Sequence, residues 1–166
     1  MNTLSRLCKH WLTTSAAGRK AFPAATLKAI EAAIAEGEHL HRAEVRLIVE
    51  PALATHMVVQ HMTSRQRAID LFAHYRIWDT EENCGVLVYI NLADHKVEIV
   101  ADRGVDRRVA QDTWEVICRA MESAFREGRF EDGAMDGIAA VSELLAQHFP
   151  RGAAGPNELP DQAIVL

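Results

Sequence analysis

The stretch that most constrains the fold runs from residue 78 to residue 104 and combines two expected strands with the turn between them. Residues 85–90 (GVLVYI) are an unbroken apolar run rich in β-branched and aromatic side chains, which is typical of a strand covered on both faces. Residues 96–102 alternate more nearly between apolar and polar side chains, which predicts a strand with one wetter face. The two strands form a hairpin, and residues 85–90 are expected at the centre of the sheet.

The position of the turn determines which residues of the hairpin face each other. If the turn is centred between Ala93 and Asp94, Asp102 lies opposite Gly85. The acidic segment before the first strand enters the sheet at this same end, so carboxylates should gather there. The candidate side chains at this end are those of Asp79, Glu81, Glu82, Asp102 and Asp106, together with Arg103.

The remaining segments complete an α/β pattern. Residues 45–50 form an expected strand that ends before Pro51, because proline cannot donate to a strand ladder. Thr63 is expected to cap a helix, with Gln66 at the N3 position of a capping box. Strand, helix and central strand make a βαβ unit with parallel strands. Further helices are expected at about 24–36, around Trp114 to Phe125, and from about Met135 to Phe149. The predicted fold class is a three-layer α/β sandwich with a small mixed sheet, built from the βαβ unit and the hairpin, and helices on both faces.

Both ends of the chain differ in character from the domain expected between residues 24 and 150. Residues 1–20 read as a basic amphipathic helix, and residues 151–166, rich in Gly, Ala, Pro and Asn, as a flexible tail. The apolar stripe of the N-terminal helix is expected to be buried, either on the domain or a second copy, or on an anionic membrane surface or membrane-associated protein reached through residues 4–20. The stripe consists of Leu4, Leu7, Trp11 and Leu12.

Composition narrows the function classes. A formal net charge of −5 and a pI of about 5.9 give no reason to expect nucleic-acid binding. The three cysteines are widely spaced and odd in number, which argues against a disulfide framework. No segment approaches the ~18 apolar residues of a membrane span, and no cleavable signal is visible. These features predict a cytoplasmic protein, peripheral at the membrane if its N-terminal helix binds there.

The sequence W-D-T-E-x-N-x-G-V-L-x-Y-I, followed after a short turn by V-E-I-V-A-D-R-G, resembles the TPM-domain family. The resemblance continues through F-R-E-G-R-F and H-F-P and covers roughly residues 24 to 150. It implies the fold predicted above and a binding or scaffolding role. Some relatives carry acid phosphatase activity or have been linked to divalent ions, so the resemblance also implies a metal-assisted phosphatase acting on phosphomonoesters as the alternative.

Two interpretations of the acidic end remain open. Carboxylates from two loops can supply the oxygen ligands that Ca²⁺ or Mg²⁺ requires, with Arg103 as a candidate phosphate-binding residue. Alternatively, they are solvated loop residues, one of them paired with Arg103. The chain contains no cysteine-phosphatase loop, Asp-x-Asp, Arg-His-Gly, phosphate loop or Gly-x-Ser-x-Gly motif, and no organic cofactor is expected.

Other polar or reactive side chains carry weaker signals. Glu50 and Asn91 end parallel strands, where open α/β folds usually bind ligands, but two residues do not specify a site. Cys84 is interpreted as a small apolar residue. The aromatic residues expected in the core are Trp78, Tyr89 and Trp114.

Overall fold

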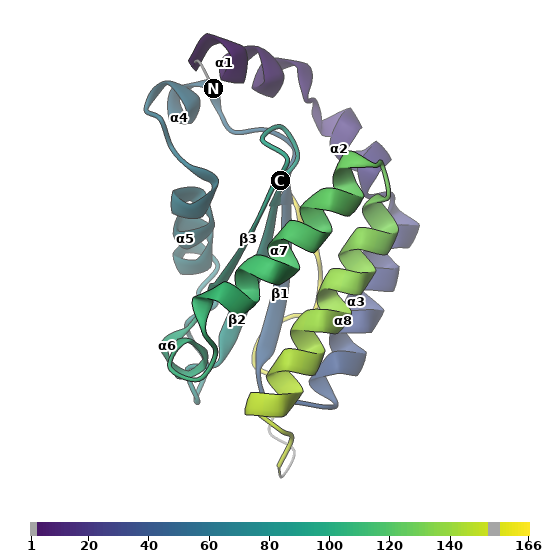
Figure 1. The fold of residues 1–166 in the computed structure, drawn as a ribbon, viewed down its shortest axis with the longest axis vertical. Helices are drawn as coiled ribbons and strands as arrows, with labels where there is room; N and C mark the ends of the chain where they lie inside the picture. Colours follow the sequence, from purple (N-terminus) through teal and green to yellow (C-terminus); the bar gives the residue numbers. More distant parts are fainter. Residues whose placement is uncertain (1–2, 153–156) are drawn as a thin grey trace.

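A computed structural model describes residues 3–152 and 157–166 of the chain; residues 1–2 and 153–156, at the start of the expected N-terminal helix and within the expected tail, lie outside the described residues. Figure 1 shows the fold. The helices and strands follow one another as α1 (Thr3–Leu12), α2 (Ser15–Ala21), α3 (Ala24–Glu38), β1 (Glu44–Glu50), α4 (Thr55–Val59), α5 (Ser64–His74), β2 (Gly85–Asn91), β3 (Lys96–Ala101), α6 (Arg103–Asp106), α7 (Gln111–Arg126), α8 (Phe130–His148) and β4 (Ile164–Val165).

The sheet has the strand order β3-β2-β1-β4. β1 and β2 are parallel, and β2 and β3 form the antiparallel hairpin. The hairpin register is the predicted one: Val86 faces Ala101, and the Asp102 N–H donates to the carbonyl oxygen of Gly85 at 2.9 Å. β2 lies inside the sheet, and all seven of its residues are buried. The predicted position of residues 85–90 is therefore confirmed.

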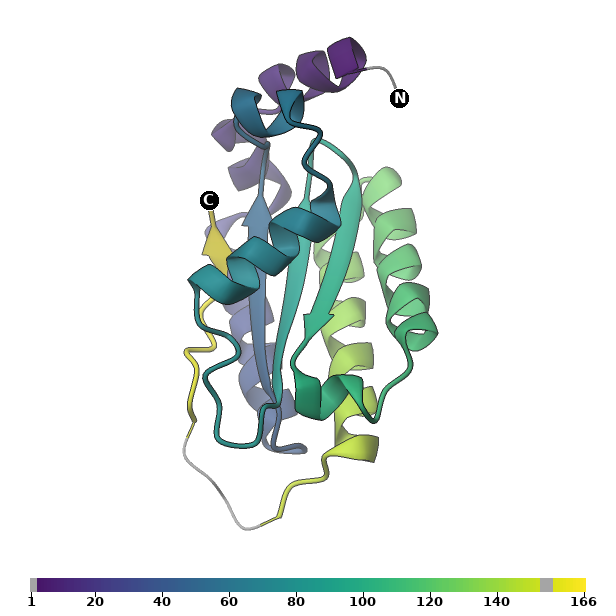
Figure 2. The ribbon, with the colours of Figure 1, turned by 90° about the vertical axis from the view of Figure 1, so that its left-hand side faces the viewer.

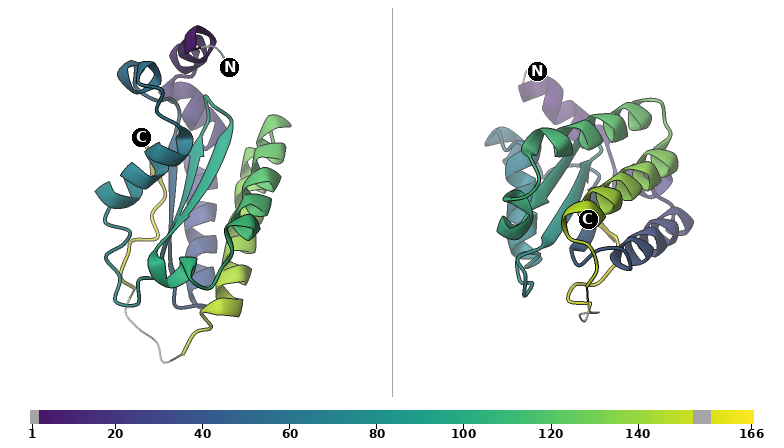
Figure 3. Two further views of the ribbon diagram at one scale, coloured as in Figure 1. Left: turned by 60° about the vertical axis from the view of Figure 1, so that its left-hand side comes forward. Right: turned by 60° about the horizontal axis from the view of Figure 1, so that its bottom comes forward.

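Helices cover both faces of the sheet, which confirms the predicted three-layer α/β sandwich. Figure 2 and the left view of Figure 3 show α5 on one face and the helices α3, α7 and α8 on the other. The larger core lies beneath these three helices and includes Trp114, whereas Tyr89 belongs to the smaller core under α5. The division follows from the strand period, since alternate residues of β2 face opposite helical layers.

Local signals set the boundaries of several helices. The capping box at Thr63 is present: its hydroxyl oxygen accepts from the Gln66 N–H at 3.1 Å, and the Gln66 side chain accepts from the Thr63 N–H at 2.9 Å. Gly128 ends the turn after α7 with a φ of +78°, a conformation that glycine adopts without steric cost.

One expectation about side-chain burial is wrong, and one alternative of another is excluded for two residues. Trp78 is 46% exposed rather than buried, and the Arg76 guanidinium lies 5.8 Å from its ring centroid. Ile77, fully buried, occupies the core in its place. In the N-terminal apolar stripe, Leu7 is half-buried, but Trp11 is 63% exposed and Leu12 is 81% exposed, so these two side chains do not pack on the domain. Their burial on a second copy or on a membrane stays a prediction.

The two ends of the chain also differ from the expected pattern. Where a single N-terminal helix was expected, the structure has α1 and α2, separated at Thr14, whose hydroxyl oxygen caps α2 by accepting from the Ala17 N–H at 3.3 Å. The segment expected to be a flexible tail contains β4, in which Ile164 pairs with Ile48 of β1. The edge of β1 is thereby covered.

Candidate functional site

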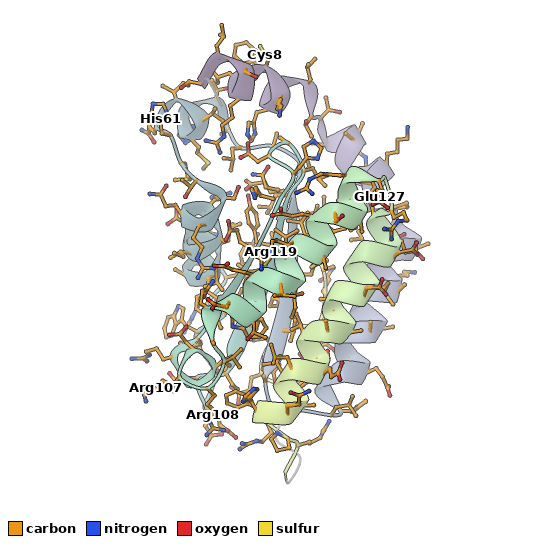
Figure 4. The ribbon with its side chains drawn as sticks, viewed as in Figure 1. Cys8, His61, Arg107, Arg108, Arg119 and Glu127 are labelled. Atoms are coloured by element: carbon orange, nitrogen blue, oxygen red, sulfur yellow. The ribbon has the colours of Figure 1, made fainter. Side chains whose placement is uncertain are left out.

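The end of the sheet at which β2 begins and β3 ends carries the predicted acidic residues. In Figure 1 this is the lower end, where α6 lies, and Figure 4 labels Arg107 and Arg108 there. The loop between α5 and β2 approaches α6 at this end. The approach depends on two glycines, Gly85 and Gly104.

Backbone oxygens crowd against these two glycines. A Cβ atom added to Gly104 would lie 2.5 Å from the carbonyl oxygen of Asn83 and 2.6 Å from that of Glu82. A Cβ added to Gly85, the residue opposite Asp102, would overlap the carbonyl oxygen of Ile77. We call Asp102 and the carbonyl oxygens of Ile77, Glu82 and Asn83 the Asp102 corner.

Asp102 is the buried acid of this group, with 6% of its surface exposed. Its carboxylate oxygen Oδ1 caps α6 by accepting from the Arg103 N–H at 2.7 Å. Its second oxygen, Oδ2, is buried and has no hydrogen-bond partner among the described residues. Burying such an oxygen without a partner is costly, so it is a position where a donor or a cation would stabilise the fold.

Among the described residues, none of the other predicted acids is recorded in contact with the Asp102 carboxylate, and two of them form ion pairs elsewhere. Asp79 pairs with Arg76 at 2.6 Å, and Glu82 pairs with Arg42 at 2.7 Å. The backbone N–H of Glu81 donates to the carboxylate of Glu158. Asp106 lies exposed on α6. Within residues 3–152 and 157–166, no three His, Cys, Asp or Glu side chains are grouped so that they could hold a metal.

Arg103 projects into solvent beside Asp102. Its side chain is 80% exposed, and its Nε atom lies 3.9 Å from Asp102 Oδ1. The guanidinium donates to the Asn83 side-chain oxygen at 3.1 Å. It is thus held near the Asp102 corner while most of it stays accessible.

A second feature at this end was missed by sequence reasoning. A cavity of about 190 Å³ lies beside the starts of β1 and β2, and the segment leading to β4 forms one wall. Carboxylates dominate its lining: Glu38, Glu44, Glu81, Glu82, Glu158 and Asp161. The signal that could have located this wall is the short apolar run at 163–166, which follows Pro160 and forms the edge strand.

Burial shifts the pKa values of several residues that line the cavity, among them Glu38 and His41. Burial raises the pKa of Glu38 to about 8, although the Val45 N–H donating at 2.9 Å partly offsets this. Burial lowers the pKa of His41 to about 4. His41 Nδ1 lies 2.9 Å from the carbonyl oxygen of Ala43, which favours a neutral ring that carries its proton on Nδ1.

The raised pKa of Glu38 predicts a pH-dependent stability. The folded protein holds a proton on Glu38 that the unfolded chain releases near pH 4.3, so stability should fall as the pH rises from there to about 8. Glu38→Gln should remove this dependence and stabilise the protein by at least about 1 kcal/mol at pH 9, with no gain near pH 4. Urea unfolding at both pH values measures the difference. Glu36→Gln, an exposed change on the same helix, is the control, and equal effects of the two changes would contradict the assignment.

At the opposite end of the sheet, where β1 and β2 end, buried side chains form hydrogen bonds with one another. The Glu50 carboxylate accepts from Arg67 Nη2 at 2.8 Å and from the Tyr89 hydroxyl at 2.6 Å. Asn91 Nδ2 donates to the same hydroxyl at 3.1 Å. Burial raises the pKa of the Tyr89 phenol, and the Glu50 charge raises it further. Glu50 and Asn91 therefore belong to a buried hydrogen-bond network.

Cys84 and Cys118 are not activated nucleophiles. Burial raises the pKa of Cys84 to about 11 and that of Cys118 to about 12. At neutral pH both are thiols, which are poor nucleophiles. The interpretation of Cys84 as a small apolar residue is confirmed, since only 2% of its surface is exposed.

Solved structures share this fold, and two of them are compared with the chain. BA42, a protein of the psychrophilic bacterium Bizionia argentinensis, is 28% identical with a TM-score of 0.76, and the match covers 87% of this chain and 94% of that one. The N-terminal domain of a protein from P. gingivalis is 16% identical with a TM-score of 0.61, covering 78% of this chain and 81% of that one, and it supports the fold alone. A comparison with curated proteins finds no match.

The family comparison covers most of the chain. The model of the TPM domain matches residues 18–144, a span that includes β1, β2, β3 and the Asp102 corner. The predicted resemblance is confirmed, and the chain belongs to the TPM domain family.

Proposed function

We propose that this TPM domain is a binding module that takes a divalent cation, Ca²⁺ or Mg²⁺, at the Asp102 corner. The observation that carries the proposal is the buried Asp102 Oδ2, which has no hydrogen-bond partner in the described part of the chain. Hard cations prefer carboxylate and carbonyl oxygens. The carbonyl oxygens of Glu82 and Asn83 lie against Gly104, two residues after Asp102, and that of Asn83 accepts from the Gly104 N–H at 2.9 Å. Asp102 and the carbonyl groups of Glu82 and Asn83 are the residues that would hold the ion.

The proposed ligand set differs from the five carboxylates expected from the sequence. Asp102 contributes its side chain, whereas Glu82 contributes its backbone and uses its carboxylate to pair with Arg42. Asp79, Glu81 and Asp106 act only through their charge, which falls off with distance and is screened by salt. The proposal can therefore be tested with substitutions that each remove one negative charge, of which only the change at Asp102 removes a side-chain ligand of the ion.

Titration with CaCl₂ and MgCl₂, followed by NMR shifts or calorimetry, tests the proposal. Asp102→Asn should weaken cation binding at least tenfold, or ~1.4 kcal/mol, while asparagine keeps the helix cap. Asp106→Asn removes the same charge at a residue that is not a proposed ligand, and Glu82→Gln removes it while keeping the Glu82 carbonyl group, so both should change affinity less than threefold. The proposal fails if the wild-type protein binds neither ion at millimolar concentration, or if all three variants lose affinity equally.

A metal-assisted phosphatase is the second candidate, favoured by the exposed Arg103 guanidinium beside Asp102. A bound divalent ion supplies charge neutralisation for a phosphoryl group. Arg103 would orient such a group and stabilise its negative charge. If this is correct, the wild-type protein should hydrolyse a generic phosphomonoester, and both Asp102→Asn and Arg103→Gln should abolish turnover. If the wild-type protein binds the cation but does not hydrolyse the phosphomonoester, the phosphatase proposal is wrong and only the binding-module proposal stands.

A further inference from the structure

Helix α1 is held to the domain by two polar side chains, Arg6 and His10, while several of its apolar side chains are exposed. Arg6 Nη2 lies 2.6 Å from an oxygen of Asp94, and His10 is 4% exposed. His10 Nδ1 accepts from the Leu53 N–H at 2.9 Å, and Nε2 lies 3.1 Å from the Asp94 carboxylate. These polar contacts anchor the helix, the reverse of the usual arrangement, in which an apolar stripe faces the core.

The exposed side of α1 carries accessible apolar side chains beside Ser5 and Lys9. Trp11 is 63% exposed, Leu12 is 81% exposed, and Cys8 is also exposed. Val59 of the neighbouring helix α4 is 53% exposed, and the Trp11 indole N–H donates to Thr55 at the start of α4. Figure 1 shows α1 and α4 together at one end of the molecule, and Figure 4 labels Cys8 there. We call Cys8, Trp11, Leu12 and Val59 the α1 surface.

Charge is distributed unevenly around this surface. The first 30 residues contain five basic and no acidic side chains, whereas the rest of the chain contains 13 basic and 23 acidic ones. Lys9, Arg19 and Lys20 are exposed on α1 and α2. A basic segment next to exposed apolar side chains complements the anionic headgroups and acyl boundary of a membrane.

We propose that the α1 surface docks on an anionic membrane, with α1 lying in the plane of the interface. Leu12 would enter the acyl boundary and Trp11 the headgroup level, where indole rings are favoured. Lys9 would lie near lipid phosphates. A second copy of the chain fits less well, because a symmetric contact would bring two basic segments together. None of the helices in the described residues is long and apolar enough to cross a membrane.

Vesicle co-sedimentation tests the proposal. The full chain should bind vesicles of phosphatidylcholine mixed with phosphatidylglycerol, bind pure phosphatidylcholine much more weakly, and lose affinity as salt rises. Leu12→Gln should lower the partition coefficient at least tenfold. Val116→Gln is the matched control, since Val116 is 59% exposed on α7 and lies outside the α1 surface. Both side chains are exposed, so neither change should disturb folding, and circular dichroism melts verify this.

Other outcomes would overturn the proposal. Equal binding of Leu12→Gln and wild-type protein to the anionic vesicles would show that the α1 surface is not the contact. Absence of vesicle binding, with concentration-dependent dimers in sedimentation velocity that Leu12→Gln abolishes, would assign the surface to a second copy. Binding that does not depend on the anionic lipid would remove the role of the basic side chains.

Discussion

Replacing Gly85 with alanine should destabilise the protein by more than about 3 kcal/mol. The new Cβ would overlap the backbone carbonyl oxygen of Ile77. Unlike the end of a flexible side chain, this oxygen belongs to a segment fixed on both sides: Ile77 is fully buried, and its N–H donates to the Phe72 carbonyl oxygen at 3.0 Å. Gly85 itself is the first residue of a fully buried strand. Neither strand nor loop can move without losing contacts.

Urea unfolding of Gly85→Ala measures the loss, and Gly152→Ala is the control because a Cβ at Gly152 meets no atom within 4 Å. The control should differ from wild type by less than about 0.5 kcal/mol. If Gly85→Ala unfolds at the same urea concentration as the control, the loop from 77 to 84 is not packed against β2 as described. The carbonyl oxygen of Ile77 would then not belong to the Asp102 corner.

The hairpin could be predicted in register because its sequence carries independent signals that agree. The apolar run at 85–90 identifies a buried strand, and the polar residues Asn91, Asp94 and His95 identify the turn. Together they place Asp102 opposite Gly85, as the 2.9 Å hydrogen bond between the two residues confirms. The capping box at Thr63 was readable for the same reason, since all its partners lie within four residues.

Contacts between distant residues could not be predicted. The sequence suggested a cluster of carboxylates, but Glu82 pairs with Arg42, 40 residues earlier, and the chain gives no sign of that contact. The orientation of α1 depends on Asp94, which lies 84 residues after His10. Without Asp94, the apolar stripe of α1 would be expected to face the core. The buried carboxylate of Asp94 favours the observed orientation, in which Arg6 and His10 face the domain, because a desolvated charge needs partners.

The second large effect is expected from Glu50→Ala at the carboxyl end of the parallel strands. Glu50 is 5% exposed and accepts from both Arg67 and Tyr89. Truncation removes the acceptor from a guanidinium that is only 18% exposed and from a fully buried phenol hydroxyl. Breaking a buried pair by removing one partner costs about 3–5 kcal/mol, because the remaining charge stays desolvated. Chemical denaturation at pH 7 should show a loss of this size.

A double-mutant cycle separates the pair from the burial of its parts. Arg67→Ala in the Glu50→Ala background should restore part of the lost stability, because it removes the uncompensated charge. Glu115→Ala is the matched control: Glu115 pairs with Arg119 at 3.3 Å on the exposed side of α7, and its loss should cost less than about 0.5 kcal/mol. A Glu50→Ala effect no larger than that of Glu115→Ala would mean that water reaches Glu50. The carboxyl end of the sheet would then be open to a ligand, in the place where parallel sheets usually bind one.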